Sequence, residues 1–193
     1  MKKIILASVS ERRSQILTSC GVKHVVIGSN IEELKSGSVS EVVRVNAEKK
    51  AEKAVQDSGE AVIIGADTLV AHGEDIIGKP QDENAAKDLL KRFSGSDIEV
   101  YTGLCVIDTS SGKKASGVDM SEITVVSMTE EKIENYFKLL APYDKAGGFS
   151  IEGAGSLLFD NIKGSYFNIL GLPMIKLNEL FKEIGLNLLE FLA

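Results

Sequence analysis

Apolar residues follow two patterns along the first third of the chain. Continuous apolar runs, which are typical of buried strands, predict strands at 3–7 and 24–27. Helical spacing of apolar positions predicts helices at 10–20, closed by Gly21, and over 38–55. Strands and helices therefore alternate, as they do in α/β proteins.

The rest of the chain contains longer strand-like runs joined by turns. The apolar stretch 61–66 is continued by 68–71, and a hairpin turn, HGED, joins it to 76–77. The remaining expectations are helices at 82–95 and 130–140 (the latter ended by Pro142), strands at 99–108, 117–128 and 157–162, a glycine-rich loop at 141–156 and a turn at 163–168. This pattern predicts an α/β fold with a mixed twisted sheet flanked by helices, built as one domain or as two lobes around a groove.

Composition narrows the class of protein. The 193 residues are 44% hydrophobic and 26% charged, which is ordinary for a globular protein with one core or two small lobes. The apolar runs are far too short to cross a bilayer. The apolar stretch in the N-terminal MKKIILAS ends at Ser8 and is too short for a secretory signal peptide. The net charge of −6 argues against a nucleic-acid polymer as partner, since such binding needs a basic surface. We therefore expect a cytoplasmic protein without a membrane or nucleic-acid partner.

Cysteine and histidine are too sparse to suggest their usual chemistry. The two cysteines, Cys20 and Cys105, and the two histidines, His24 and His72, have no metal-ligand spacing. Catalysis by a Cys–His or Ser–His pair and binding of a soft metal are therefore disfavoured. A required metal would be a hard cation held by carboxylates and substrate oxygens.

Two arginines stand where a helix start ordinarily carries acidic residues. In LASVSERR, Ser10 suits an N-cap and Glu11 suits the first turn. Arg12 and Arg13 instead add positive charge to the positive end of the helix dipole. An anion from outside the chain, and phosphate above all, would explain both cations. The alternative is a pair of solvated surface arginines.

Three further features could carry chemistry, and each has an ordinary structural alternative. Asp67 stands at the end of the most hydrophobic strand, where a carboxylate needs partners or a function unless it bonds to its own loop. Lys79 lies between Gly78 and Pro80 in a constrained loop, unless it is a plain exposed lysine. Four glycines within 141–156 would let a ligand approach the backbone, but they also suit a connecting loop. Neither GxxxxGK[ST] nor GxGxxG is present, so P-loop and Rossmann sites are disfavoured.

Five motifs follow one another along the chain: LASVSERR, GADTLV, GKP, YDKAGGFSIEG and GSYFNILGLP. Their order and spacing resemble those of the Maf family of nucleoside triphosphate pyrophosphatases. The resemblance runs from the first strand to about Leu180, so we expect a single Maf-like domain over 1–193. It implies hydrolysis of a nucleoside triphosphate to the monophosphate and pyrophosphate in a house-cleaning role, with a divalent cation (Mg²⁺, Mn²⁺ or Co²⁺). It also implies an architecture resembling inosine triphosphate pyrophosphatase, with a cleft between lobes. A homodimer, in which a second copy of the chain is the partner, stays open as an alternative.

The resemblance also assigns roles to residues of this sequence. It implies that Asp67 accepts the proton of the attacking water and, together with Glu33, binds the metal. The substrate-binding residues that it implies are Ser8, Arg12, Arg13, Glu33, Lys50, Thr68, Lys79 and Glu152. Among these, the cations at positions 13, 50 and 79 would hold phosphates, and positions 12, 68 and 152 would discriminate the base.

Glu152 is the main departure from the family pattern. The branch that hydrolyses dTTP and UTP usually has glutamine at this position. A branch that resembles 7-methyl-GTP hydrolases has glutamate there, but lacks the arginine found here at Arg12. The expected substrate is therefore dTTP, UTP or a modified nucleotide, with 7-methyl-GTP as the alternative. Two other classes stay open: a sugar-activating nucleotidyltransferase and a non-catalytic, nucleotide-binding regulator of cell division.

Overall fold

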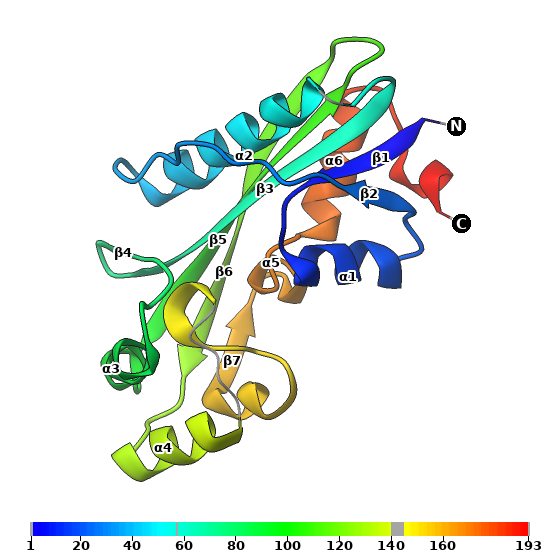
Figure 1. The fold of residues 1–193 in the computed structure, drawn as a ribbon. Helices are drawn as coiled ribbons and strands as arrows, with labels where there is room; N and C mark the ends of the chain where they lie inside the picture. Colours follow the sequence, from blue (N-terminus) through cyan, green and yellow to red (C-terminus); the bar gives the residue numbers. More distant parts are fainter. Residues whose placement is uncertain (1, 57, 140–144, 193) are drawn as a thin grey trace. The chain divides into compact units, whose positions relative to one another are not determined.

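The computed structural model describes residues 2–56, 58–139 and 145–192, and its centre is a seven-stranded mixed sheet (Figure 1). The strands are β1 (Lys3–Ala7), β2 (His24–Val26), β3 (Ala61–His72), β4 (Asp75–Ile77), β5 (Asp97–Asp108), β6 (Lys114–Val125) and β7 (Phe159–Lys163). Their order is β2-β1-β3-β5-β6-β7, and β4 pairs with β3. β1 is parallel to β2 and β3, whereas β4 is antiparallel to β3 and β7 is antiparallel to β6. The predicted mixed sheet is therefore confirmed.

Helices flank the sheet, as the alternating apolar pattern predicts (Figure 1). They are α1 (Glu11–Ser19), α2 (Val39–Val55), α3 (Glu83–Phe93), α4 (Glu130–Leu139), α5 (Tyr166–Ile169) and α6 (Met174–Glu183). Short 3₁₀ helices occur at η2 (Ala146–Gly148), η3 (Gly153–Leu158) and η4 (Leu188–Phe191). The α/β class is therefore confirmed.

The described chain divides into two compact units, which we call unit 1 and unit 2. Unit 1 contains the described parts of 1–67, 102–119 and 170–193, and unit 2 contains those of 68–101 and 120–169. Strands β3, β5 and β6 each contribute residues to both units. Each unit therefore contains its own part of the sheet.

Helix α2 packs directly on the sheet in unit 1. Its buried face consists of Val42, Val43, Asn46, Ala47, Ala51 and Ala54. A Cβ atom on Gly65 of β3 would overlap the carbonyl oxygen of Ala47, and one on Gly103 of β5 would overlap that of Val43. Because both glycines lack a side chain, the backbone of α2 lies against the two strands. This close approach brings polar side chains of α2 to β3.

The predicted strands differ from the structure mainly in where they end. β3 runs without a break from Ala61 to His72, which confirms that 68–71 continues the strand of 61–66. Asp67, which was expected at the end of the most hydrophobic strand, therefore lies inside it. The residues after Asp67 are apolar or β-branched and continue the strand pattern, which explains the difference. The strand expected at 117–128 is also displaced: β6 begins at Lys114 and ends at Val125.

The turn expected at 163–168 contains the start of a short helix, α5. Ser165 initiates this helix, because its carbonyl oxygen accepts hydrogen bonds from the N–H groups of Asn168 and Ile169. Its hydroxyl oxygen also accepts a bond from the Asn168 N–H at 3.3 Å, as a capping side chain does. The loop expected at 141–156 contains η2 and part of η3, and Pro142 lies outside the described residues.

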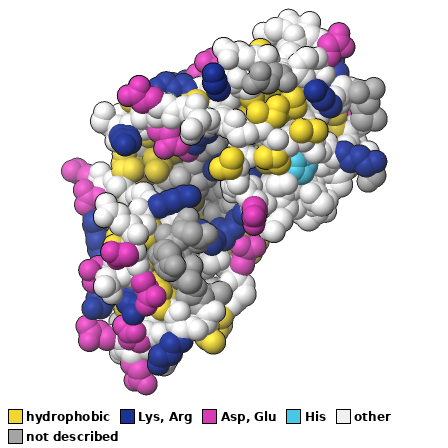
Figure 2. Space-filling model, viewed as in Figure 1, with side chains coloured by type: hydrophobic (Ala, Val, Ile, Leu, Met, Phe, Trp, Pro, Cys, Tyr) yellow, Lys and Arg dark blue, Asp and Glu magenta, His cyan; other side chains and the backbone are white. Residues whose placement is uncertain are grey.

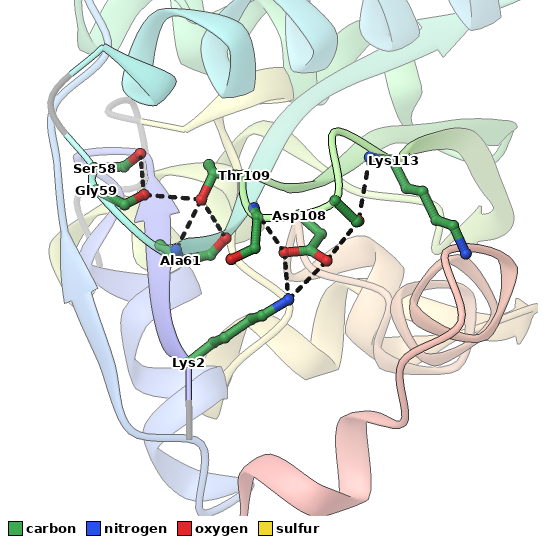
Figure 3. A network of polar contacts seen from close by, with 9 residues as sticks. Lys2, Ser58, Gly59, Ala61, Asp108, Thr109 and Lys113 are labelled. Carbon is green, nitrogen blue, oxygen red and sulfur yellow. Dashed lines mark hydrogen bonds and ion pairs between the residues drawn. The ribbon is translucent and has the colours of Figure 1, made fainter.

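A polar network closes one end of the sheet in unit 1 (Figure 3). Lys2 donates to both carboxylate oxygens of Asp108 at 2.8 Å, and Asp108 is 3% exposed. Thr109 Oγ1 accepts a hydrogen bond from the Ala61 N–H at 2.8 Å. These contacts tie the beginnings of β1 and β3 to the end of β5. Asp67 lies further along β3, at a distance of roughly 20 Å for six residues of strand.

Charged side chains of both signs are interspersed on the face shown in Figure 2. Some pair across elements, as Lys87 of α3 does with Glu134 of α4 at 2.8 Å. Exposed pairs of this kind add little stability individually. Among the described residues, no helix is both long enough and apolar enough to span a bilayer.

Candidate active site

The candidate site in unit 1 lies beyond the carboxyl end of strand β1. The last residue pair between β1 and β3 is Ala7 with Gly65, and β3 continues past this pair to Asp67. The chain that leaves β1 passes through Ser8 and enters α1 at Glu11. The carboxyl ends of parallel strands are the place where open α/β sheets hold their ligands.

Two side chains of α2 hold Asp67. Lys50 Nζ lies 2.6 Å from Asp67 Oδ1, and Asn46 Nδ2 donates to Asp67 Oδ2 at 3.1 Å. Asn46 and Lys50 are four residues apart, so they project from the same face of the helix. Asp67 is 8% exposed, and a carboxylate with so little access to water needs such partners.

Glu33 shares the ammonium group of Lys50 with Asp67. Lys50 Nζ lies 2.8 Å from Glu33 Oε1, so it contacts both carboxylates at once. The Glu33 side chain is 49% exposed, whereas that of Asp67 is 12% exposed. The two carboxylates therefore lie on either side of one cation, and Glu33 is the one that solvent reaches.

Glu33 and Asp67 supply the hard oxygen donors that Mg²⁺ and Mn²⁺ prefer. Within the part of the chain that the structure describes, no group of three or more His, Cys, Asp or Glu residues could hold a metal ion. Two carboxylates nevertheless fit a hydrated divalent cation, because Mg²⁺ is commonly bound by one or two carboxylates together with water and substrate phosphates. The position of Lys50 Nζ between them indicates that positive charge is accommodated there.

Arg13 lies in the first turn of α1, and two hydrogen bonds fix its guanidinium group. Its Nε donates to the Gly171 carbonyl oxygen at 2.7 Å, and its Nη1 donates to Ser8 Oγ at 3.1 Å. Burial lowers the pKa of the Arg13 guanidinium from its ordinary value, and the negative charges of Asp67 and Glu33 oppose that shift. Arg13 therefore lies in the electric field of both carboxylates and remains a cation at neutral pH.

Ser8 supports Arg13 from the loop between β1 and α1. This buried serine also accepts a hydrogen bond from the Ser10 N–H at 3.2 Å. Ser10 occupies the N-cap position of α1, as the sequence predicts. Arg12 is half-buried at the neighbouring position of the same helical turn.

The other predicted residues belong to unit 2. Thr68 is half-buried and follows Asp67 directly in β3. Lys79 is exposed in the loop after β4. This loop is anchored because the Gly147 N–H donates to the Gly78 carbonyl oxygen at 3.1 Å. The glycine-rich segment therefore serves, in unit 2, to fix the loop that carries Lys79.

Glu152 is exposed and directly precedes η3. Its N–H donates to Ser150 Oγ at 3.3 Å, and its carbonyl oxygen accepts a bond from the Gly155 N–H at 3.1 Å. The Ser150 N–H in turn donates to the Tyr136 hydroxyl group at 3.0 Å. These bonds fix the backbone at Glu152 and leave its carboxylate on the surface of unit 2.

Unit 1 thus brings together five of the predicted residues, namely Ser8, Arg13, Glu33, Lys50 and Asp67. Asn46 and the carbonyl group of Gly171 also belong to this cluster, and neither was predicted from the sequence. Asn46 had a recognisable signal, because it is a polar residue one turn before Lys50 on a helix face of valine and alanine. A backbone acceptor such as Gly171 leaves no comparable signal in the sequence.

One buried and one half-exposed carboxylate, with cations beside them beyond a parallel strand, define an α/β protein suited to hold an anionic ligand. The family model described as Maf-like protein matches residues 3–184. The chain therefore belongs to the Maf-like protein family, and the resemblance drawn from its motifs is confirmed.

Curated relatives match over nearly the whole chain. A protein of Dictyoglomus thermophilum named dTTP/UTP pyrophosphatase is 41% identical over 191 residues, which cover 97% of this chain and 99% of the relative. A protein of the same name from Clostridioides difficile is 40% identical over 182 residues, covering 93% and 94%. A crystal structure of a nucleoside-triphosphatase / dITP/XTP pyrophosphatase from Mycobacterium abscessus aligns with a TM-score of 0.41 and 17% identity, over 64% of this chain and 74% of that chain. That structural likeness is too low to support a conclusion about this protein.

Proposed function

We propose that this Maf-like protein hydrolyses nucleoside triphosphates to the nucleoside monophosphate and pyrophosphate, with dTTP and UTP as favoured substrates and a house-cleaning role. The observation that carries the proposal is the cluster in which Asp67 lies beside Lys50, with Arg13 in the field of the same carboxylate. A carboxylate surrounded by cations is suited to activating water next to a polyphosphate. The names of the curated relatives support the same reaction.

Asp67 is the proposed general base. It orients the attacking water and accepts its proton, while the new phosphorus–oxygen bond forms and the anhydride bond between the α- and β-phosphates breaks. The leaving pyrophosphate carries the electron pair of that bond. A positioned general base contributes about 10²- to 10⁴-fold to such a reaction.

Arg13, Lys50 and Lys79 are the proposed phosphate-binding cations. Negative charge grows on the leaving pyrophosphate, and fixed positive groups offset it. Arg13 is suited to this because its hydrogen bonds to Gly171 and Ser8 hold the guanidinium before any substrate binds. Lys50 can exchange its contacts with Asp67 for contacts with a phosphate, since an ammonium group on a flexible stem binds as a point charge.

Glu33 and Asp67 would hold the divalent cation that we propose as cofactor. When bound, such a cation polarises phosphate oxygens and neutralises part of their charge. The ammonium group of Lys50 must then leave the space between the two carboxylates. Substrate phosphates provide it with an alternative partner.

Arg12, Thr68 and Glu152 are the proposed base-reading residues. An ionised glutamate side chain only accepts hydrogen bonds, whereas glutamine also donates them. Glu152 therefore favours 7-methyl-GTP pyrophosphatase activity as the second candidate function, because a guanine edge presents N–H donors.

We further propose that 1–193 acts as one functional domain in the cytoplasm, without a membrane or nucleic-acid partner, and that a homodimer is its expected assembly if it self-associates.

A turnover panel tests this proposal. Purified protein with Mg²⁺ is given dTTP, UTP, CTP, GTP and 7-methyl-GTP, and both monophosphate and pyrophosphate are quantified. The expected result is a one-to-one yield of the two products, fastest with dTTP or UTP. Release of pyrophosphate without a sugar phosphate excludes a nucleotidyltransferase. Nucleotide binding without turnover would overturn the proposal in favour of a regulatory protein.

A further inference from the structure

Asn46 belongs to the unit 1 cluster, where its side-chain amide makes three hydrogen bonds. Its Oδ1 accepts a hydrogen bond from the Leu34 N–H at 2.7 Å, and its Nδ2 donates to the Leu34 carbonyl oxygen at 3.1 Å. The same Nδ2 donates to Asp67 Oδ2 at 3.1 Å. An amide nitrogen has two hydrogens, so each of them has one acceptor. Asn46 is 2% exposed, and water does not compete with these bonds.

The two bonds to Leu34 determine where the neighbouring carboxylate lies. Glu33 directly precedes Leu34 in an irregular segment, which lacks a helical or strand ladder to fix it. A side-chain amide that binds both the N–H and the carbonyl oxygen of one residue substitutes for such a ladder. Asn46 therefore connects the segment that carries Glu33 to helix α2.

The third bond of Asn46, to Asp67, contacts strand β3 and not the Leu34 segment. Asp67 lies on β3, which approaches α2 closely because Gly65 lacks a side chain at the contact with Ala47. The donated N–H fixes one oxygen of the Asp67 carboxylate, while Lys50 contacts the other. The bonds to Leu34 close the loop by themselves, and the third bond pairs the remaining N–H of this buried amide with Asp67.

Asn46 and Lys50 differ in how firmly they hold Asp67. Lys50 divides its ammonium group between Asp67 and Glu33 and has a long flexible stem. The planar amide of Asn46 is fixed at two further atoms. When Lys50 moves to a phosphate, Asn46 remains as the donor that keeps Asp67 in place.

We infer that Asn46 is a positioning residue: one amide sets the orientation of Asp67 and ties the Glu33 segment to α2. The kinetic part of this inference rests on the proposed function. The geometric part does not, because it concerns the hydrogen bond that protects the Leu34 amide. The two parts can therefore be tested separately.

Two variants of similar size separate these roles. Asn46→Asp keeps an oxygen for the Leu34 N–H but loses both donated bonds, and Asn46→Leu loses all three. We expect kcat for dTTP to fall about 10- to 100-fold in both variants, the range for a lost hydrogen bond to a charged group, with KM within about threefold. Hydrogen exchange at the Leu34 amide should stay slow in Asn46→Asp and become at least about tenfold faster in Asn46→Leu.

Asn168→Asp is the matched control. Asn168 is fully buried in unit 2, where its Nδ2 donates to the Val100 carbonyl oxygen at 2.8 Å and to Ser121 Oγ at 2.9 Å. This change should lower the melting temperature while leaving kcat within about twofold. It should also leave Leu34 exchange unchanged. The control therefore measures what the loss of a buried asparagine costs in stability alone.

Each outcome distinguishes the inference from the proposed function. If the wild-type protein turns over no nucleotide but Leu34 exchange changes as expected, the proposed function fails and the structural role of Asn46 stands. If the wild-type protein is active and both variants keep kcat within about twofold, Asn46 does not position the base. If a variant does not fold, slow exchange at Leu34 in the wild-type protein still tests the contact, and fast exchange there overturns it.

Discussion

In unit 1, Asp67 and Lys50 are largely buried and contact each other directly. In unit 2, Lys79 and Glu152 are exposed, and backbone hydrogen bonds fix the loops that carry them. Side chains that hold one another have one geometry before a ligand arrives, whereas exposed side chains on anchored loops can adapt. In the proposed division of roles, the chemistry lies in unit 1, whereas unit 2 contributes Lys79 to phosphate binding and Thr68 and Glu152 to reading the base.

The largest effect is expected from the centre of unit 1. Asp67→Asn should lower kcat by about 10²- to 10⁴-fold, because an amide cannot accept the proton of the attacking water. Steady-state kinetics with dTTP measures this, and a thermal melt checks that the variant folds. A variant that retains more than about a tenth of the wild-type kcat excludes Asp67 as general base.

A reciprocal exchange of cations compares the two units more directly. Arg13→Lys should lower kcat/KM about 10- to 100-fold, because one ammonium group cannot replace the fork that reaches both Gly171 and Ser8. Lys79→Arg should change kcat/KM by less than about threefold, since an exposed cation on a loop can be replaced by another. Both variants should keep the wild-type ranking of nucleotides. Equal losses in the two variants would contradict the difference between the units.

Selectivity should respond to Glu152 in unit 2. Glu152→Gln should raise the ratio of kcat/KM for dTTP to that for 7-methyl-GTP by about 5- to 100-fold, the effect of gaining or losing one hydrogen bond to the base. Removing a negative charge near an anionic ligand can improve every substrate, so only the ratio is diagnostic. A ratio within about twofold of the wild-type value would mean that Glu152 does not read the base.

The smallest effect on activity is expected from Asp108, at the end of β5 beside the start of β3. Burial acts to raise the pKa of Asp108, but the hydrogen bonds from Lys2 and Ser111 outweigh it and lower the pKa below its ordinary value. A lowered pKa in the folded state stabilises the protein above the unfolded pKa, and this contribution disappears as the pH falls through the folded value. Asp108→Asn should therefore cost about 1–3 kcal/mol at pH 7, with a gap to wild type that narrows in acid.

Denaturant unfolding at several pH values measures this difference, and dTTP turnover of the same variant should stay within about twofold of wild type. A loss of kcat as large as that of Asp67→Asn would show that activity depends on overall stability and not on the unit 1 cluster. A gap that stays constant into acid would contradict the role of the Lys2–Asp108 ion pair.

The sequence predicted the parts of the molecule that have a local signal. Apolar periodicity identified β1 and α2, and the family resemblance named Asp67, Lys50 and Arg13 as candidate site residues. The sequence also predicted that 68–71 continues the strand of 61–66, as β3 does, but a carboxylate in an apolar run suggested that Asp67 stands at a strand end. The pairing of β3 with β1 ends at Ala7 and Gly65, so Asp67 lies beyond the part of β3 that β1 covers.

Long-range contacts of the site had no such signal. The bond from Arg13 to the Gly171 carbonyl joins residues 158 positions apart and uses a backbone acceptor that every residue possesses. Asn46 lies on the buried face of α2, where it is a polar residue at a position that the helical pattern makes apolar. Its bonds to Leu34 and Asp67 depend on the folded backbone, in which β3 packs closely on α2.

The central claim is that the unit 1 cluster hydrolyses the bond between the α- and β-phosphates. The most direct test is to incubate purified wild-type protein with dTTP and Mg²⁺ in ¹⁸O-labelled water and to identify all phosphorylated products by mass spectrometry. We predict dTMP and pyrophosphate in equal amounts, with one labelled oxygen in dTMP because pyrophosphate is the leaving group, and the same products at least about a hundredfold more slowly from Asp67→Asn. Formation of dTDP and orthophosphate, or equal rates from the two proteins, would contradict the claim.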